Sequence, residues 1–351
     1  IPANTLIEKG TMEVNEIKVN LEFFLGGDYK FLLIAMGMKA ANSGHSCIWC
    51  KVSSSQRCQL SLTREYFQER QRVLHDNWPK DDGCNTTPLF QIPVDPVAFD
   101  ELHMLLRVTD RLETGLILDM EHWDQKDAFV EGKRQQDSHH VNALLKAIKG
   151  CGVNFSVWKG KDGKLEWTSL MGNDKKRLLK LLPEKFPEIL RPATCEQITK
   201  LWKDFRELYH VITSDSPTQT EIKNFHSEAI LWAKHLVSLN KLPGYNQINP
   251  ITPYIHILVY HAFDVLERYD SVKTFSGQGV EKKNDDFRRY FMRKINRWDA
   301  CASMLKVEKR QEVLRYKERL SRVYRKLDLE FWFLGGKEQA ASQLSTSPVQ
   351  H

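Results

Sequence analysis

This sequence lacks any long apolar run. No stretch of its 351 residues approaches the roughly 18 consecutive apolar residues that a membrane-spanning helix needs. The first residues also lack the basic segment, apolar segment and small-residue cleavage site of a secretory leader. These absences predict a protein that has no membrane partner and is not secreted.

Cysteine is scarce and, apart from one pair, without pattern. The seven cysteines are an odd number and are scattered along the chain, which argues against a disulfide framework and for a reducing compartment. Two intervening residues separate Cys47 from Cys50, so one tight turn would carry two thiolates, which is half of a tetrahedral zinc site. Redox chemistry and chance are the alternatives for such a pair.

The composition is that of a globular protein, with 41% hydrophobic and 27% charged residues, and the length suits one large domain or two ordinary ones. The formal net charge is +6, and the segments 282–297 and 306–326 are strongly basic. Such segments suit the phosphate backbone of a nucleic acid. The alternative for each segment is the solvated face of an ordinary helix.

Hydrophobic periodicity predicts a short β region followed by a long helical part. Residues 16–25 alternate apolar and polar side chains and predict a strand, while the apolar run 29–40 fits a buried helix or a second strand. Segments 155–158 and 165–168 flank an Asp-Gly turn and predict a hairpin. Helices are predicted at 62–77, 96–126, 138–148, 173–182, 195–213, 221–239, 277–298 and 302–326, and a polar, disordered tail at 335–351.

Two carboxylates stand where local structure would fix them. Asp28 follows the predicted strand and a pair of glycines, where it suits either a metal ligand or the N-cap of a helix. Glu281 falls in the first turn of the helix that opens after Gly277, where it suits either a metal ion or the helix dipole. Cations on the same helix fit phosphodiester chemistry, because they would hold the substrate backbone: Arg288, Arg289, Arg293, Lys294 and Arg297.

Two histidines are the best candidates for the other half of a zinc site. His256 and His261 are five residues apart, so on a regular helix they would diverge by about 140°. Both can reach one ion only if the helix is distorted or ends, and Pro253 with the loop near residue 249 could allow this. The alternative is that each histidine is a buried, hydrogen-bonded core residue.

A third pair, Asp100 and His103, would share one face of a helix. Together they could orient a water, reach a metal or contact a phosphate. The alternative is a surface aspartate beside a half-buried histidine.

Taken in order, these pieces resemble the catalytic subunit of the V(D)J recombinase and its Transib-type transposase relatives, which are DDE enzymes with a ribonuclease-H-like fold. The strongest match runs from residue 251 to 291 and contains the two histidines, the glycine-bearing turn and Glu281, twenty residues after His261. The second runs from Asp28 to Cys50, with nineteen residues from Asp28 to Cys47. Shorter matches cover 100–103 and 170–176.

The resemblance implies roles for these residues. Asp28 and Glu281 would be carboxylates of a two-metal site that uses Mg²⁺ or Mn²⁺, and Asp100 and His103 would lie near it. A structural Zn²⁺ would be held by four ligands, Cys47, Cys50, His256 and His261. The resemblance also implies a nuclear protein that acts on DNA as a homodimer, with an accessory subunit as a further candidate partner.

One departure from the family limits the expected activity. Its site needs three carboxylates, the first from an early strand, but residues 1–27 contain no aspartate, and the glutamates there sit in or beside the wrong strand. We therefore expect a fragment of a transposase or recombinase that does not cleave DNA efficiently alone. The first alternative is a non-enzymatic, zinc-stabilised DNA- or protein-binding module derived from a transposase. The second is an unrelated helical scaffold with a redox Cys pair.

The predicted fold class is α+β. A partial ribonuclease-H-like core, made of a short β region and a returning catalytic helix, would be interrupted by a long, mostly α-helical zinc-binding insertion. The expected boundaries are 11–41 for the strands and Asp28, 42–275 for the insertion, 276–334 for the glutamate helix and the basic C-terminal helix, and 335–351 for the tail.

Overall fold

A computed structural model describes residues 2–130, 138–246, 249–293, 295 and 298–316, without the side chains of residues 130, 278, 280 and 281. The chain divides into two units, Ile1–Glu281 and Lys282–His351. Within the described residues the protein is mostly helical and has a few short two-stranded sheets.

The first unit begins with short elements and continues with helices. The short elements are α1 (Ala3–Lys9), β1 (Thr11–Val14), β2 (Ile17–Asn20), β3 (Leu25–Gly27), α2 (Tyr29–Ala35), α3 (Arg64–Gln68) and β4 (Val97–Phe99). The helical part contains α4 (Glu101–Val130), α5 (His139–Gly150), β5 (Val157–Lys159), β6 (Leu165–Trp167), α6 (Gly172–Leu181), α7 (Phe186–Ile189), α8 (Pro192–Thr213), α9 (Gln219–Ser238), α10 (Pro253–Tyr260) and α11 (Ala262–Tyr269). Short 3₁₀ turns lie at Gln56–Cys58, Trp78–Lys80, Leu182–Lys185, Leu239–Lys241 and Lys273–Phe275.

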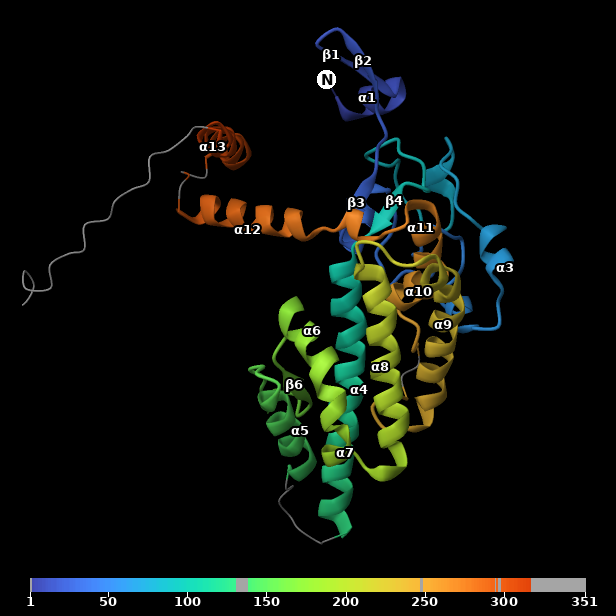
Figure 1. Ribbon diagram of the computed structural model, residues 1–351, viewed down its shortest axis with the longest axis vertical. Coiled ribbons are helices and arrows are strands. Elements are labelled where there is room, and N and C mark those ends of the chain that lie inside the picture. Colours follow the sequence, from blue (N-terminus) through green and yellow to red (C-terminus); the bar gives the residue numbers. More distant parts are fainter. Residues whose placement is uncertain (1, 131–137, 247–248, 294, 296–297, 317–351) are drawn as a thin grey trace, which may run out of the picture. The chain divides into compact units, whose positions relative to one another are not determined.

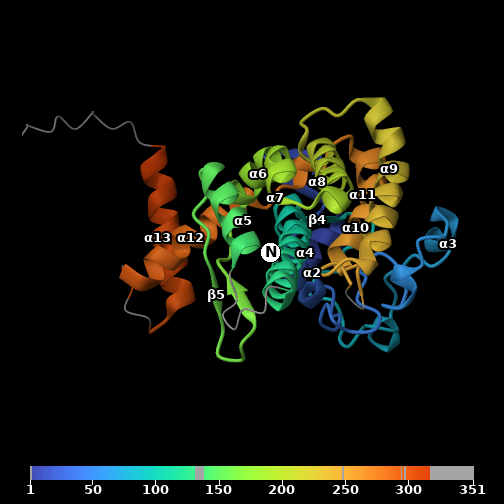
Figure 2. The same cartoon turned by 90° about the horizontal axis from the view of Figure 1, so that it is seen from below.

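The long helix α4 is the centre of the helical part (Figure 1). It packs against α5 and α6 on one side and against α8 and α10 on the other, and α9 covers α8 (Figure 2). Large aromatic residues from α8 and α9 are fully buried between these helices: Trp202, Phe205, Phe225 and Trp232. Helix α4 lies in the same apolar core, because Met104, Leu105 and Val108 near its start are fully buried.

The strands pair two by two. β1 and β2 form an antiparallel hairpin, as do β5 and β6, whereas β3 and β4 are parallel. In the parallel pair Gly27 lies opposite Phe99, so Asp28 and Asp100 are the next residues at the same edge of the sheet. Each of these strands leads directly into a helix, α2 after β3 and α4 after β4.

Several sequence predictions need correction. The helix predicted at 62–77 is wrong beyond its first part, because only α3 is helical and the following residues form a loop around the buried Arg72. The helix predicted from residue 96 begins at Glu101, because residues 97–99 pair with β3. The strand predicted at 16–25 is divided into β2 and β3. The run 29–40 takes the helical alternative up to Ala35.

The remaining predicted elements are confirmed within a few residues. The hairpin is β5–β6, and the helices predicted at 138–148, 173–182, 195–213 and 221–239 are α5, α6, α8 and α9. A capping box formed by Thr218 and Glu221 explains why α9 starts two residues before its predicted position. None of the described helices is long and apolar enough to cross a membrane.

The second unit is described up to residue 316. It contains most of α12 (Gln278–Arg293) and α13 (Ala300–Arg315). Lys283 on α12 forms an ion pair with Glu308 on α13, and Arg315 contacts the same carboxylate at 3.4 Å. These contacts place the two helices against each other. The predicted extension of the last helix to residue 326 and the predicted tail at 335–351 lie outside the described residues.

Candidate metal centre and sheet edge

The four predicted zinc ligands meet in one buried cluster. Their ligating atoms all lie within 4.8 Å of one another. Cys47 Sγ is 3.3 Å from His261 Nε2, Cys50 Sγ is 3.3 Å from His256 Nε2, and the two Nε2 atoms are 3.2 Å apart. None of the four residues is more than 5% exposed. The chain thus contains a buried Cys₂His₂ cluster that could bind a metal, and within the described part it is the one group of three or more such ligands.

The spacing of the ligand atoms fits a structural zinc ion. A tetrahedral Zn²⁺ with bonds of about 2.0–2.1 Å to nitrogen and about 2.3 Å to sulfur keeps neighbouring ligand atoms about 3.3–3.8 Å apart, nitrogen pairs at the short end and the sulfur pair at the long end. The separations of 3.2 and 3.3 Å are close to these values. Since all four ligands come from the protein and are buried, the cluster is of the closed type that suggests a structural metal such as Zn²⁺.

A helix break at His261 lets the two histidines converge. Helix α10 ends at Tyr260 and α11 begins at Ala262, and His261 between them has φ −124° and ψ −22°. The helix therefore ends between the two rings, which is one of the two conditions predicted for both of them to reach one ion. The predicted cause was wrong, however, because Pro253 is simply the first residue of α10 and Thr252 caps that helix.

The environment of the two thiols favours one thiolate. Burial would raise the pKa of Cys47, but the hydrogen bond from Cys50 and the nearby His261 and His256 rings outweigh it and lower that pKa well below its ordinary value. Burial and the neighbouring Cys47 raise the pKa of Cys50. Burial lowers the pKa of His256 and keeps its ring neutral, as metal ligation requires.

Arg72 holds the turn that carries Cys47 and Cys50, a role that the sequence did not predict. Its side chain is 1% exposed and donates from Nε to the Cys47 carbonyl at 2.8 Å and from Nη2 to the Asp82 carbonyl at 2.6 Å. The indole of Trp49 stacks on His261 with ring centroids 5.5 Å apart and donates to the Val97 carbonyl on β4. The Cys₂His₂ cluster is therefore connected directly to the parallel strand pair through Trp49.

Asp28 lies at the carboxyl end of β3 and caps α2. Its Oδ1 accepts a hydrogen bond from the Phe31 amide at 3.0 Å, which confirms the N-cap alternative. A carboxylate has a second oxygen, so this cap leaves the predicted role as a metal ligand open. Burial raises the pKa of Tyr254 to about 12, and the negative charges of Asp28 and Asp100 contribute to this rise. Both carboxylates therefore lie near the Tyr254 hydroxyl.

Asp100 is buried, which corrects the alternative that placed it on the surface. It is 3% exposed, whereas the side chain of His103 is 19% exposed, so the half-buried histidine is confirmed. Asp100 Oδ2 lies 2.5 Å from His103 Nδ1, and Asp100 Oδ1 accepts from the Gly277 amide at 2.9 Å. A contact between residues 177 apart therefore brings the turn before α12 to the β3–β4 edge.

The predicted residues on α12 are only partly described. Glu281 lies in the first turn of α12, but its side chain lies outside the description, and so do Lys294 and Arg297. Arg288, Arg289 and Arg293 are exposed. Arg289 forms ion pairs with Asp286 and, at 3.6 Å, with Asp285, whereas no ion pair is recorded for the other two within the described residues.

A cavity of about 420 Å³ opens beside His261 and Trp49. Arg64 of α3 forms part of its wall and pairs with Asp264 at 2.7 Å and with Glu267 at 2.8 Å, both on α11. These ion pairs hold α3 against α11, the helix that directly follows His261.

A comparison with models of protein families finds no match for this chain, and a comparison with curated proteins finds none either.

Proposed function

We propose that this chain is the C-terminal part of a DDE-type transposase or recombinase, and that it binds DNA and contributes two carboxylates to a two-metal phosphodiester site. The observation that carries the proposal is the meeting of Cys47 and Cys50 with His256 and His261. More than 200 residues separate the two halves of this cluster, so the fold has to bring distant segments together to form it. The partial ribonuclease-H-like core belongs to the same proposal.

The β3–β4 edge supports the position of the proposed site. Ligands of open sheets with parallel strands bind outside the carboxyl ends of the strands, and Asp28 and Asp100 stand there side by side. The hydrogen bond from Gly277 to Asp100 brings the beginning of α12 to this edge, and Glu281 follows that turn by four residues. Elements far apart in the sequence thus supply acidic residues to one place.

The described carboxylates do not account for cleavage by themselves. Among the residues that the structure describes, no group of three ligands includes Asp28. Asp100 already accepts three hydrogen bonds, one from Gly277 and two from His103. When bound, Mg²⁺ or Mn²⁺ ions would activate the nucleophile and stabilise the leaving oxygen. A further carboxylate is needed to hold them, so we expect this chain alone to bind DNA without cutting it efficiently.

Charge reversal on α12 tests DNA binding. Arg288→Glu with Arg293→Glu removes two exposed cations, and Lys223→Glu with Lys234→Glu on α9 is a control with the same change in net charge. The affinity for a labelled DNA duplex, measured by fluorescence anisotropy, should fall linearly on a log–log plot against salt, with a slope of about −0.9 per phosphate contact. The α12 variant should lose affinity and flatten this slope by about 2. A salt-independent affinity, or an equal loss in both variants, would contradict the proposal.

A non-enzymatic DNA- or protein-binding module stabilised by zinc is the second candidate. The observation that favours it is the missing third ligand around Asp28 within the described chain. DNA cleavage in Mn²⁺ separates the two candidates. Cleavage that Asp28→Ala abolishes would establish the enzyme and refute our expectation that the chain is inactive alone. The first proposal also includes a nuclear location, a homodimer and an accessory subunit. Analytical sedimentation of the chain bound to DNA would give its mass and so test the homodimer.

A further inference from the structure

The carboxylate of Asp100 joins three parts of the proposed site. Its Oδ2 accepts hydrogen bonds from the His103 amide at 3.1 Å and from His103 Nδ1 at 2.5 Å. Its Oδ1 accepts from the Gly277 amide at 2.9 Å. It also follows β4 at the edge where Asp28 follows β3. One buried side chain thus contacts the start of α4, a histidine ring and the turn that opens α12.

We propose that Asp100 is the positioning residue of this site: it fixes the tautomer of His103 and anchors the turn that starts the Glu281 helix. The inference deepens the proposed function, because it assigns His103 and α12 to one arrangement. Its evidence consists of contacts within the protein, so it can be tested without DNA.

The contact with Asp100 determines which ring nitrogen of His103 carries the proton. A carboxylate only accepts hydrogen bonds, so Nδ1 must donate to it. When the ring is neutral, its lone pair is then on Nε2, the form in which a histidine accepts a proton or ligates a cation. Burial would raise the pKa of Asp100, but the hydrogen bonds from His103 and Gly277 outweigh it and lower that pKa. Asp100 therefore remains an anion at neutral pH.

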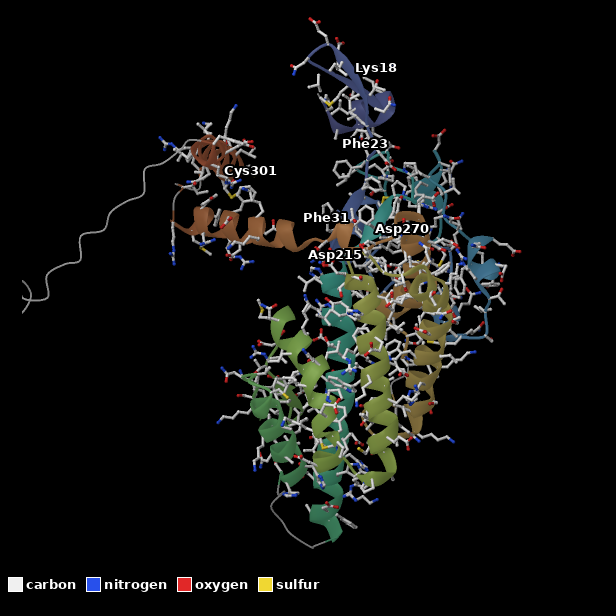
Figure 3. The ribbon with its side chains drawn as sticks, in the orientation of Figure 1. Lys18, Phe23, Phe31, Asp215, Asp270 and Cys301 are labelled. Atoms are coloured by element: carbon white, nitrogen blue, oxygen red, sulfur yellow. The ribbon has the colours of Figure 1, made fainter. Side chains whose placement is uncertain are left out.

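The contact at Gly277 is the last of several hydrogen bonds and ion pairs that hold residues 270–277. Asp270 accepts from Gln219, the first residue of α9, at 3.2 Å, and Lys273 pairs with Asp215 in the α8–α9 connection at 2.7 Å (Figure 3). The first part of this segment is therefore held by the start of α9 and the residues before it. Ser276 Oγ then donates to Glu101 at 2.6 Å, immediately before the Gly277 contact. Residues 270–277 therefore end against the first turn of α4, and Asp100 and Glu101 together hold the point where α12 begins.

Gly277 is required by the closeness of this contact. A Cβ atom at residue 277 would lie 2.8 Å from Asp100 Oδ1, which is closer than carbon and oxygen can pack. Gly277→Ala should therefore push the turn away from the carboxylate and leave the Asp100–His103 contact in place. His103→Gln should have the opposite effect. The two variants separate the two roles of Asp100.

Two measurements on the full chain test the inference. Nitrogen-15 spectra of the histidine side chains identify the protonated ring nitrogen of His103, and hydrogen exchange measures protection of the amide at position 277. In the unaltered protein we expect the proton on Nδ1 and a protected amide. Asp100→Asn should move the proton to Nε2 and accelerate exchange at Gly277 at least about tenfold, since a charge-assisted bond is lost. Glu121→Gln, a partly exposed carboxylate on α4, is the matched control and should change neither.

Several results would overturn the inference. They are an Nε2-protonated His103 in the unaltered protein, an unprotected Gly277 amide, or an Asp100→Asn variant with both signals unchanged. If Asp100→Asn does not fold, Gly277→Ala and His103→Gln decide instead. The inference is supported if Gly277→Ala loses protection of the amide at position 277 without a change in the His103 tautomer, and if His103→Gln keeps that protection. Any other combination refutes it. A failure of DNA binding would leave these signals untouched and would count only against the proposed function.

Discussion

Removing the metal should destabilise the fold by several kilocalories per mole. A bound ion would link Cys47 to His261 and Cys50 to His256, across sequence separations of 214 and 206 residues. Cross-linking two points of an unfolded chain about 200 residues apart lowers its conformational entropy by an amount worth about 5 kcal/mol at 25 °C. The net stability of a folded domain is about 5–15 kcal/mol. Loss of the metal should therefore cost a large fraction of the stability of the first unit.

Urea unfolding with metal analysis measures this effect. The purified chain should contain about one zinc per molecule, and a chelator that removes it should shift the unfolding midpoint to much lower urea. His261→Ala and Cys50→Ser should show the low midpoint without chelator. Cys151→Ser, which alters a buried cysteine outside the cluster, is the control that should keep both zinc and chelator sensitivity. If the zinc-free protein unfolded at the same urea concentration as the zinc-bound protein, the cross-link argument would be wrong.

Three further predictions concern the support of the site and of α4. Arg72→Met should cost about 3 kcal/mol or more, because it removes buried charge-assisted donors, and it should weaken zinc retention in a competition assay with a chelator. Burial raises the pKa of Asp119 to about 6, so the free energy of unfolding falls as pH rises from about 4 through 6. Above pH 6, Asp119→Asn should therefore be more stable than the unaltered protein, by up to about 3 kcal/mol in urea unfolding. An equal pH dependence in both would refute this. Gly115→Ala should cost about 1–3 kcal/mol by calorimetry, since the new Cβ would lie 2.7 Å from the ring of Tyr245.

The sequence predicts the long regular elements and the four-ligand cluster well. The helices with clear apolar periodicity, α5, α6, α8 and α9, lie within a few residues of their predicted positions, because their burial follows directly from that pattern. The cluster was predictable because Cys47 and Cys50 define a turn and because His256 and His261 could converge if their helix was distorted or ended. The structure places that end at His261 itself.

The sheet edge could not be predicted in the same way. β4 is three residues long and precedes a strong helical pattern, so residues 97–99 looked like the beginning of α4. Only pairing with β3 makes them a strand, and that pairing joins segments about 70 residues apart in the sequence. The same limit hid Arg72, since a charged residue in a polar stretch gives no signal that it will be buried on backbone carbonyls. The contact of Asp100 with Gly277 depends on the completed fold.

The identity of the metal ligands is the most direct test of the central claim, that Cys47, Cys50, His256 and His261 hold one structural ion. X-ray absorption at the zinc edge of the purified chain measures the number and type of bonded atoms. The structure predicts two sulfur atoms at about 2.3 Å and two imidazole nitrogens at about 2.0 Å. His261→Ala should lose one nitrogen or the ion itself. A shell of oxygen atoms, or four sulfur atoms, would contradict the claim.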